Sequence, residues 1–250
     1  MSAGELIIES SNNIQVDYKG SLNLVTNVDR AAEKLIIENI LTNFPNHSIL
    51  AEESGFKNKT HDYLWTIDPI DGTTNFVHGY PSFGVSIGLL IKGVPTLGVV
   101  LELPSKNLYS AYKDNGSFKN GTKINVSKNS ILDECLLTTG FPYDHGKKWQ
   151  ASMKLFEFFT DKTQGVRRLG AACIDLCHLA CGVIDGFWEF DLKPWDTAAG
   201  IVIVTEASGV ISKIDGNKYN IHEDQILASN GIIHEDLLLS PNPFIDLTLK

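Results

Sequence analysis

The sequence predicts a mixed fold in which layers of α-helix and β-sheet alternate. Stretches with helical periodicity stand between short apolar and β-branched runs along the whole chain. The chain has 250 residues, 43% of them apolar, which is enough for a substantial core. No low-complexity linker divides it. We therefore expect a single unit, 1–250, with two α/β halves at about 1–140 and 141–250.

The first half is expected to combine one long helix with several strands. A helix is predicted at 29–43, where apolar residues follow the 3.6 period and Pro45 lies just beyond the end. Strands are predicted at 48–51, 63–67 and 108–113, with a hairpin at 83–103 and a turn with two Asn-Gly pairs at 114–123.

The second half alternates helices with short strands. Helices are predicted at 149–160 and 171–184, with a strand and turn between them at 165–170. A strand at 187–190 precedes a helix within 195–209 that we expect Gly209 to close. A hairpin should then turn at Asp215 and Gly216.

Composition excludes several classes of protein. The net charge is −9 and no long Lys/Arg run appears, so nucleic acid is not an expected partner. The first ten residues lack the basic and apolar regions of a signal peptide. The apolar stretch 83–103 is interrupted by Lys92, Gly93 and Pro95, so no membrane span or membrane partner is expected.

Four cysteines could suggest a metal site or disulfides. Cys173, Cys177 and Cys181 recur at every fourth position on one face of an apolar helix, and Cys135 stands apart. This spacing differs from the usual C-x2-C of zinc sites, so we expect buried, reduced thiols and a cytoplasmic protein.

Two aspartates follow the strand at 63–67, three residues apart in W-T-I-D-P-I-D-G-T-T-N. Pro69 cannot donate to a sheet ladder and Gly72 permits a sharp turn, so the strand should end before Asp68. The carboxylates of Asp68 and Asp71 would then lie close together. Their mutual repulsion requires a cation or a shared proton.

Other carboxylates follow strands or begin helices. Glu52 and Glu53 come after the strand at 48–51, and Asp196 begins a helix after Pro194. If these ends converge, they form an all-oxygen site, which selects Mg²⁺ or Mn²⁺ over zinc. The D-P-I-D-G spacing does not match an EF-hand loop.

Each of these residues also has a structural interpretation. Asp196 alone could be an N-cap, Glu52 and Glu53 solvated charges, and Asp68 a turn residue. The same holds further along the chain, where Glu189 could be a charge at a strand edge and the pair Arg167 and Arg168 could be solvated.

The motifs together resemble the inositol monophosphatase family. The similarity rests on W-T-I-D-P-I-D-G-T-T-N-F, on A-E-E-S at 51–54 and on P-W-D-T-A-A-G at 194–200. K-G-S-L-N-L-V-T-N-V-D at 19–29 and F-W-E at 187–189 also match, in the family's order, from about residue 15 to about 230. The first helix is expected to be shorter than is usual in the family.

The resemblance implies a dimeric, lithium-sensitive, Mg²⁺-dependent phosphatase of small polyol phosphates, with the layered sandwich of the inositol monophosphatase and fructose-bisphosphatase type. It assigns one metal to Glu52, Asp68 and the carbonyl of Ile70, and a second to Asp68, Asp71 and Asp196. A third, weaker magnesium would lie beside Glu52. Glu52 is also counted among the catalytic residues. Mn²⁺ is an alternative ion.

The resemblance also assigns the water and the substrate. Asp29 and Thr73 would activate the water, and Glu189 would bind substrate hydroxyls. The N–H groups of Gly72, Thr73 and Thr74 would face the phosphate. Lys19 and Arg168 are possible substrate-side residues.

The expected substrate is inositol 1-phosphate. Enzymes of the same family for histidinol phosphate, fructose 1,6-bisphosphate and 3′-phosphoadenosine 5′-phosphate remain alternatives. An inactive regulatory relative is a further alternative from a different class, although every carboxylate that the metals need is present.

Overall fold

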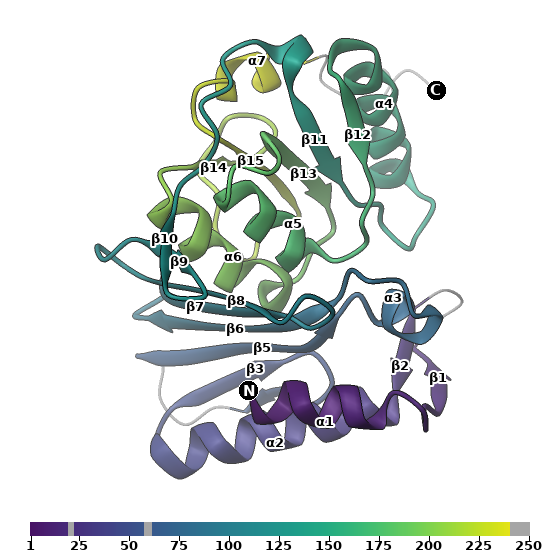
Figure 1. Ribbon diagram of the computed structural model, residues 1–250, viewed down its shortest axis with the longest axis vertical. Helices are drawn as coiled ribbons and strands as arrows, with labels where there is room; N and C mark the ends of the chain where they lie inside the picture. Colours follow the sequence, from purple (N-terminus) through teal and green to yellow (C-terminus); the bar gives the residue numbers. More distant parts are fainter. Residues whose placement is uncertain (20–22, 58–61, 241–250) are drawn as a thin grey trace.

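The computed structural model describes residues 1–19, 23–57 and 62–240, and these residues form five layers (Figure 1). From bottom to top in that view, they are a helix pair, an eight-stranded sheet, a second helix pair, a five-stranded sheet and an outer layer of two helices. The predicted alternation of α and β layers is confirmed.

The lower part of the molecule contains α1 (Ser2–Ser10) and α2 (Asn27–Asn43) beneath the eight-stranded sheet. In spatial order the strands of this sheet are β10 (Thr122–Ile124), β9 (Ser117–Lys119), β8 (Asn107–Tyr112), β7 (Val94–Glu102), β6 (Gly84–Ile91), β5 (Tyr63–Asp71), β3 (Ser48–Ala51) and β4 (Gly55–Lys57). Among the described strands of this eight-stranded sheet, β3 and β5 pair in parallel and the other neighbours are antiparallel. A separate ribbon joins β1 (Val16–Tyr18) to β2 (Leu24–Thr26).

The upper part begins with the central helices α5 (Ala172–Ala180) and α6 (Pro194–Glu206), which lie between the two sheets (Figure 1). The five-stranded sheet has the order β12 (Gly165–Arg167), β11 (Leu136–Thr139), β13 (Gly186–Phe190), β15 (Gln225–Ser229) and β14 (Val210–Ser212). The short 3₁₀ turn Leu132–Glu134 leads into β11, and the outer helices are α4 (Lys147–Lys162) and α7 (His234–Leu238).

Helix α6 approaches the eight-stranded sheet closely because glycines face it. A Cβ on Gly98 would lie within 3.0 Å of the Ala199 carbonyl. A Cβ on Gly88 would lie 3.0 Å from the Cβ of Ala198. Side chains at either position would push the helix away. The glycines therefore hold the first turn of α6, which carries Asp196, against the sheet.

Strand β5 corrects the prediction for this segment. It does not end before Asp68 but continues to Asp71, and its register against β6 shifts between the two aspartates. Pro69 is tolerated because it lies within this irregularity, where a donor to the ladder is not needed. A helix that the sequence analysis did not predict, α3 (Thr73–His78), follows at once.

Three other boundaries were wrong. Helix α5 ends at Ala180, before the left-handed Gly182 with φ of 70°, and does not reach residue 184. Helix α6 ends at Glu206, and the left-handed residue after it is Ser208, not Gly209. The expected turn at 114–123 contains strand β9 and the start of β10, because its Asn-Gly pairs form turns at both ends of β9.

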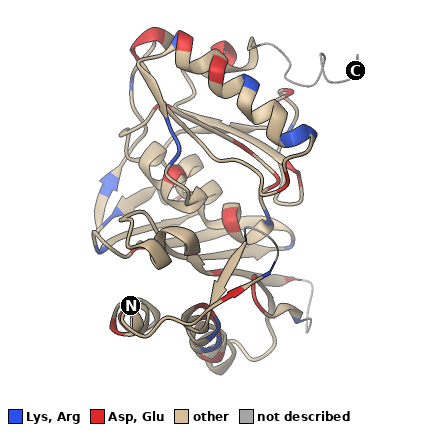
Figure 2. Cartoon of the chain, turned by 90° about the vertical axis from the view of Figure 1, so that its right-hand side faces the viewer, with Lys and Arg blue, Asp and Glu red and all other residues tan. Residues whose placement is uncertain are grey.

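The remaining features of the fold can be stated briefly. The four cysteines are free thiols; Cys135, Cys173 and Cys177 are buried as predicted, whereas Cys181 is only partly buried. The first helix has nine residues. None of the helices in the described ranges is long and apolar enough to cross a bilayer. Lysine and arginine residues are spread over several elements, and so are the acidic ones (Figure 2).

Candidate active site

A cavity of about 280 Å³ opens between the eight-stranded sheet and the upper part of the molecule. It lies between the end of β5, the N-terminus of α5 and the loop from β13 to α6. Ten of the residues predicted from the sequence line it: Lys19, Glu52, Asp68, Ile70, Asp71, Gly72, Thr73, Arg168, Glu189 and Asp196. Thr74 lines an adjoining cavity instead, and Asp29 lies beneath Thr73.

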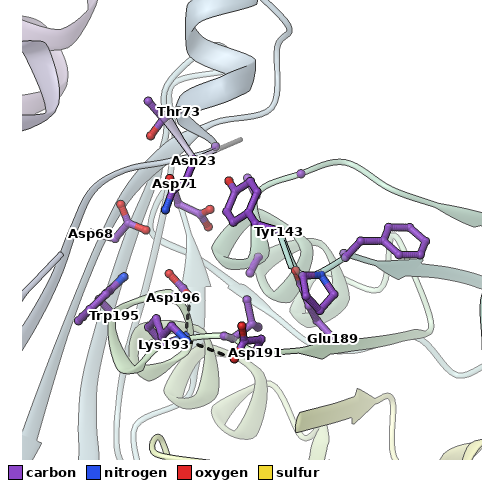
Figure 3. A pocket seen from close by; sticks show the side chains of 18 of the residues that line it. Asn23, Asp68, Asp71, Thr73, Tyr143, Glu189, Asp191, Lys193, Trp195 and Asp196 are labelled. Atoms are coloured by element: carbon purple, nitrogen blue, oxygen red, sulfur yellow. Dashed lines mark hydrogen bonds and ion pairs between the residues drawn. The ribbon is translucent and has the colours of Figure 1, made fainter. Parts of the chain in front are cut away.

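Three aspartates lie around one space in this cavity (Figure 3). Asp68 is 2% exposed, and burial, followed by the charges of Glu52 and Asp71, raises its pKa well above the usual range. Burial and Asp71 raise the pKa of Asp196 in the same direction. Burial raises the pKa of Asp71 itself to about 6. The fold therefore gathers negative charges that repel one another.

Each aspartate accepts a hydrogen bond from a backbone N–H. Asp71 Oδ2 accepts from Cys173 N at 2.6 Å, at the start of α5, and Asp196 Oδ2 accepts from Lys193 N at 2.6 Å. Asp68 Oδ1 accepts from Ile70 N at 3.0 Å. Asp196 is therefore not the N-cap of its helix, which is Lys193. It is the N3 residue, and its carboxylate closes the capping box at Lys193 while it also lines the cavity.

Asp29 and Thr73 form a second feature of the site. Asp29 is fully buried, and its Oδ2 accepts from the backbone N–H and the hydroxyl of Thr26. Its Oδ1 faces the Thr73 hydroxyl at 3.1 Å, and that hydroxyl also lies 3.0 Å from the carbonyl of Ile70. Burial raises the pKa of Asp29, although the Thr26 hydrogen bonds oppose this.

The turn after β3 carries Glu52 and Glu53. Lys19 Nζ lies 2.9 Å from Glu52 Oε1 and 2.5 Å from Glu53 Oε1. These two charges raise the pKa of Lys19 even though burial alone would lower it. Behind the turn, the buried Glu33 of α2 accepts from Glu53 N at 2.7 Å. The turn is therefore anchored from both sides.

Gly72 connects β5 to α3 in a conformation that requires glycine. Its φ is 88°, and a Cβ there would lie 2.8 Å from the Ser82 carbonyl. Asn75, one turn later, donates to Ser82 O at 2.6 Å and to Leu169 O at 2.7 Å. This amide joins the loop before β6 to the segment before α5, beside the cavity.

Glu189 occupies the opposite wall of the cavity, on β13 (Figure 3). Burial, and then the charges of Asp175 and Asp196, raise its pKa well above the usual range. No hydrogen-bond donor to its carboxylate is found in 1–19, 23–57 or 62–240. Arg168 lines the same cavity with an exposed side chain, and Arg167 is also exposed but lines neither cavity.

The acidic side chains of the cavity do not surround a single point as the ligands of one metal ion would. Within the described ranges, no three Asp, Glu, His or Cys side chains are gathered closely enough to hold one metal. The carboxylates nevertheless share one cavity with the Ile70 carbonyl, so they form an all-oxygen donor set. Such a set suits Mg²⁺ or Mn²⁺.

Comparison with known proteins identifies the family. The family model described as "Inositol monophosphatase family" matches residues 1–241. The chain belongs to the inositol monophosphatase family. Membership places it among the phosphoric monoester hydrolases.

Similar proteins carry more than one name. The chain is 45% identical to the chloroplastic phosphatase IMPL1 of Arabidopsis thaliana, covering 95% of this chain and 66% of that protein. It is 48% identical to inositol-1-monophosphatase of Synechocystis, over 89% of this chain and 78% of that one. It is also 40% identical to the Nus factor SuhB of Pseudomonas aeruginosa, over 100% and 95%.

The fold of the solved relatives agrees with the architecture described above. The structure of inositol monophosphatase from Anabaena superposes with a TM-score of 0.87 at 42% identity, over 95% of this chain and 89% of that one. The layered sandwich expected for this inositol monophosphatase family member is thereby confirmed.

Sequence reasoning missed several residues of this family member's site. Tyr143, Asp191 and Lys193 line the cavity, and Glu33 anchors the turn that carries Glu52. Lys193 directly precedes the P-W-D segment, so its position in the motif could have indicated it. The other three gave no local signal: Tyr143 and Asp191 reach the cavity only through the fold, and Glu33 lies behind the turn at 52–53 and not in the cavity.

Proposed function

We propose that the protein hydrolyses phosphate monoesters of small polyols, with inositol 1-phosphate as its substrate. One observation carries the proposal: Glu52, Asp68, Asp71 and Asp196 line a single cavity and repel one another. A phosphate monoester is itself a dianion. The cavity and the substrate are both negatively charged, so cations are needed to neutralise them.

Two Mg²⁺ ions, with a third as an option, would supply this charge. Glu52, Asp68 and the Ile70 carbonyl would hold one, and Asp68, Asp71 and Asp196 the other. When bound, such ions lower the pKa of a water and stabilise the oxygen that leaves phosphorus. Mn²⁺ would suit the same oxygen ligands.

Asp29 and Thr73 would position the attacking water and remove its proton. The Thr73 hydroxyl donates to Asp29 Oδ1, which leaves the Thr73 oxygen able to accept from a water in the cavity. As the water attacks, its proton can pass to the Thr73 oxygen while the Thr73 proton passes to Asp29. Burial of Asp29 raises its pKa and favours this transfer.

The remaining residues would bind the substrate. The N–H groups at Gly72, Thr73 and Thr74 would hold the phosphate at the start of α3. Glu189, which has no donor among the described residues, would accept from hydroxyls of the polyol. Lys19 and Arg168 would add positive charge at the rim.

Two alternatives remain distinct from this proposal. A bisphosphate substrate needs cations for its second phosphate, and Arg168 is the arginine that lines the cavity within the described ranges. A regulatory protein without activity would not need the Asp29 and Thr73 pair. A homodimer, a cytoplasmic location and inhibition by lithium stay predictions.

The test is phosphate release with Mg²⁺ from four esters: inositol 1-phosphate, histidinol phosphate, fructose 1,6-bisphosphate and 3′-phosphoadenosine 5′-phosphate. We expect the highest kcat/KM for inositol 1-phosphate, loss of activity in EDTA, and inhibition by millimolar lithium. A higher kcat/KM for another ester would replace the substrate. No release from any of them would overturn the proposal.

A further inference from the structure

Gly140 lies beside Glu189 at the edge of the cavity. Strands β11 and β13 are parallel, with Thr138 next to Phe187 and Thr139 next to Trp188. The next pair in this register is Gly140 and Glu189. Side chains at paired positions of neighbouring strands point to the same face of a sheet. A side chain at 140 would therefore enter the space that the Glu189 side chain fills.

The space beside Gly140 is taken by the carboxylate itself. A Cβ built on Gly140 would lie well inside 3.0 Å of Glu189 Cδ, Oε1 and Oε2, and these are its three nearest neighbours. Gly140 is not among the glycines with positive φ. Its backbone would accept alanine, so the obstacle to a side chain is the Glu189 carboxylate.

The backbones on both sides are fixed, so the Glu189 side chain is the part that would have to move. The buried Thr139 hydroxyl donates to Trp188 O at 2.7 Å and ties the end of β11 to β13. On its other side, Glu189 pairs with Ile226 of β15. A carboxylate at the end of a flexible side chain rotates more easily than two paired strands separate.

The present position of the carboxylate matters for recognition. Glu189 is directed to the cavity and has no donor in the described part of the chain (Figure 3). Glu189 is half-buried, and its carboxylate oxygens are left to accept hydrogen bonds from a ligand that supplies donors. A polyol supplies hydroxyls, whereas an aryl phosphate has none to offer.

We infer that Gly140 is a positioning residue that sets specificity for polyol esters, because only glycine there leaves the Glu189 carboxylate directed at the substrate hydroxyls. The inference rests on the proposed polyol substrate and on the role of Glu189. It also makes a statement about the conformation of Glu189 that can be tested without a substrate.

The kinetic test compares Gly140→Ala, Glu189→Ala and the double variant on inositol 1-phosphate and p-nitrophenyl phosphate. Gly140→Ala should raise KM for inositol 1-phosphate on the order of 10-fold and change kcat/KM for the aryl ester less than about twofold. In the Glu189→Ala background, Gly140→Ala should add nothing. Equal losses on both substrates, or an additional loss in the double variant, would overturn the inference.

Gly146→Ala is the matched control. Gly146 has φ of −82° and stands in the same loop between β11 and α4, but a Cβ there would meet nothing closer than 3.5 Å. Gly146→Ala should leave KM and kcat/KM unchanged for both substrates. A change equal to that of Gly140→Ala would show that the loop, and not Glu189, is responsible.

A crystal structure of Gly140→Ala separates this inference from the proposed function. The Glu189 carboxylate should turn away from residue 140 while β11 and β13 keep their pairing. If it stays in place, the inference is wrong whatever the substrate. If the carboxylate moves but Gly140→Ala hydrolyses inositol 1-phosphate as well as wild type does, the proposed role of Glu189 is wrong. If wild type hydrolyses only the aryl ester, the polyol substrate is wrong and the structure alone decides whether Gly140 positions Glu189.

Discussion

Two centres of buried carboxylate chemistry in this molecule have opposite electrostatics. In the cavity, burial and neighbouring acids raise the pKa values of Asp68 and Asp196. At the end of β7, burial would also raise the pKa of Glu102, but hydrogen bonds from neighbouring side chains lower it from 4.5 to about 2. Asp68 and Glu102 are both buried and Asp196 is half-buried, so the two centres differ mainly in what surrounds the carboxylate.

Glu102 is satisfied by the protein itself. It accepts from Ser105 Oγ at 2.5 Å and Asn107 Nδ2 at 2.9 Å, and His178 Nε2 of α5 lies 3.4 Å away. This network joins the eight-stranded sheet to a central helix. The comparison teaches that a buried carboxylate supplied with donors stabilises the fold, whereas acids that face one another leave a charge for a ligand to neutralise.

The largest effect that separates the two centres is expected for Asp196→Asn. Asparagine can still accept from Lys193 N, but it removes a negative charge from the proposed second metal site. We expect kcat to fall on the order of 10²-fold or more, because one such contact is worth roughly 3 kcal/mol in the transition state.

The stability of the same variant should change in the other direction. Removing one of several repelling charges should raise the melting temperature of the EDTA-treated protein. Asp224→Asn, at an exposed ion pair with Lys148, is the control and should keep wild-type kcat. If Asp196→Asn keeps the wild-type kcat at ordinary Mg²⁺ concentrations, the metal-binding role proposed for the cavity carboxylates is wrong.

The second prediction concerns Glu102→Gln, which should leave kcat and KM unchanged but lower the free energy of unfolding. The fall of the Glu102 pKa from 4.5 to about 2 limits this loss in the free energy of unfolding to about 3 kcal/mol at neutral pH. Because the folded-state pKa is lowered, this stability is present above pH 4.5 and is lost as the pH falls toward 2.

Urea unfolding of wild type and Glu102→Gln at several pH values measures this directly. The difference between the two proteins should be greatest near pH 7 and shrink below about pH 4.5. A difference that is constant across this range would mean that Glu102 stabilises the fold by packing and not by its charge.

A smaller effect is expected from Glu33, which supports the cavity from behind. Glu33→Ala removes the acceptor for Glu53 N and should loosen the turn that carries Glu52. We expect the Mg²⁺ concentration for half-maximal activity to rise about 10-fold, as is usual when a residue that orients a metal ligand is lost. Glu33→Gln keeps an acceptor oxygen and should be nearer to wild type.

Glu38→Ala provides the control for Glu33. It lies on the same helix, but its side chain is exposed and its ion pair with Lys34 is long, at 3.8 Å. It should not change the Mg²⁺ requirement. An equal rise for both alanine variants would assign the effect to helix α2 as a whole.

The sequence predicted the parts of the site that depend on local spacing. Asp68 and Asp71 lie three residues apart, and Asp196 begins a helix, so residue pattern alone indicated acids at strand and helix ends. Asp29 and Thr73 are 44 residues apart, and their hydrogen bond was expected only through the family resemblance.

The features that sequence reasoning missed come from tertiary packing. Proline usually ends a strand, but the register shift of β5 accommodates Pro69. Gly140 has an ordinary backbone, so nothing local indicates that a neighbouring strand fills its side-chain space. Glu33 resembles any acid on an exposed helix until the fold places the turn at 52–53 over it.

The central claim is that the cavity carboxylates bind divalent cations and that the satisfied carboxylate does not. Calorimetric titration of EDTA-treated, dialysed protein with Mn²⁺, followed by competition with Mg²⁺, tests it most directly. We predict at least two ions per chain for wild type and for Glu102→Gln, and the loss of at least one in Asp196→Asn. No binding to wild type, or identical binding by wild type and Asp196→Asn, would contradict the account.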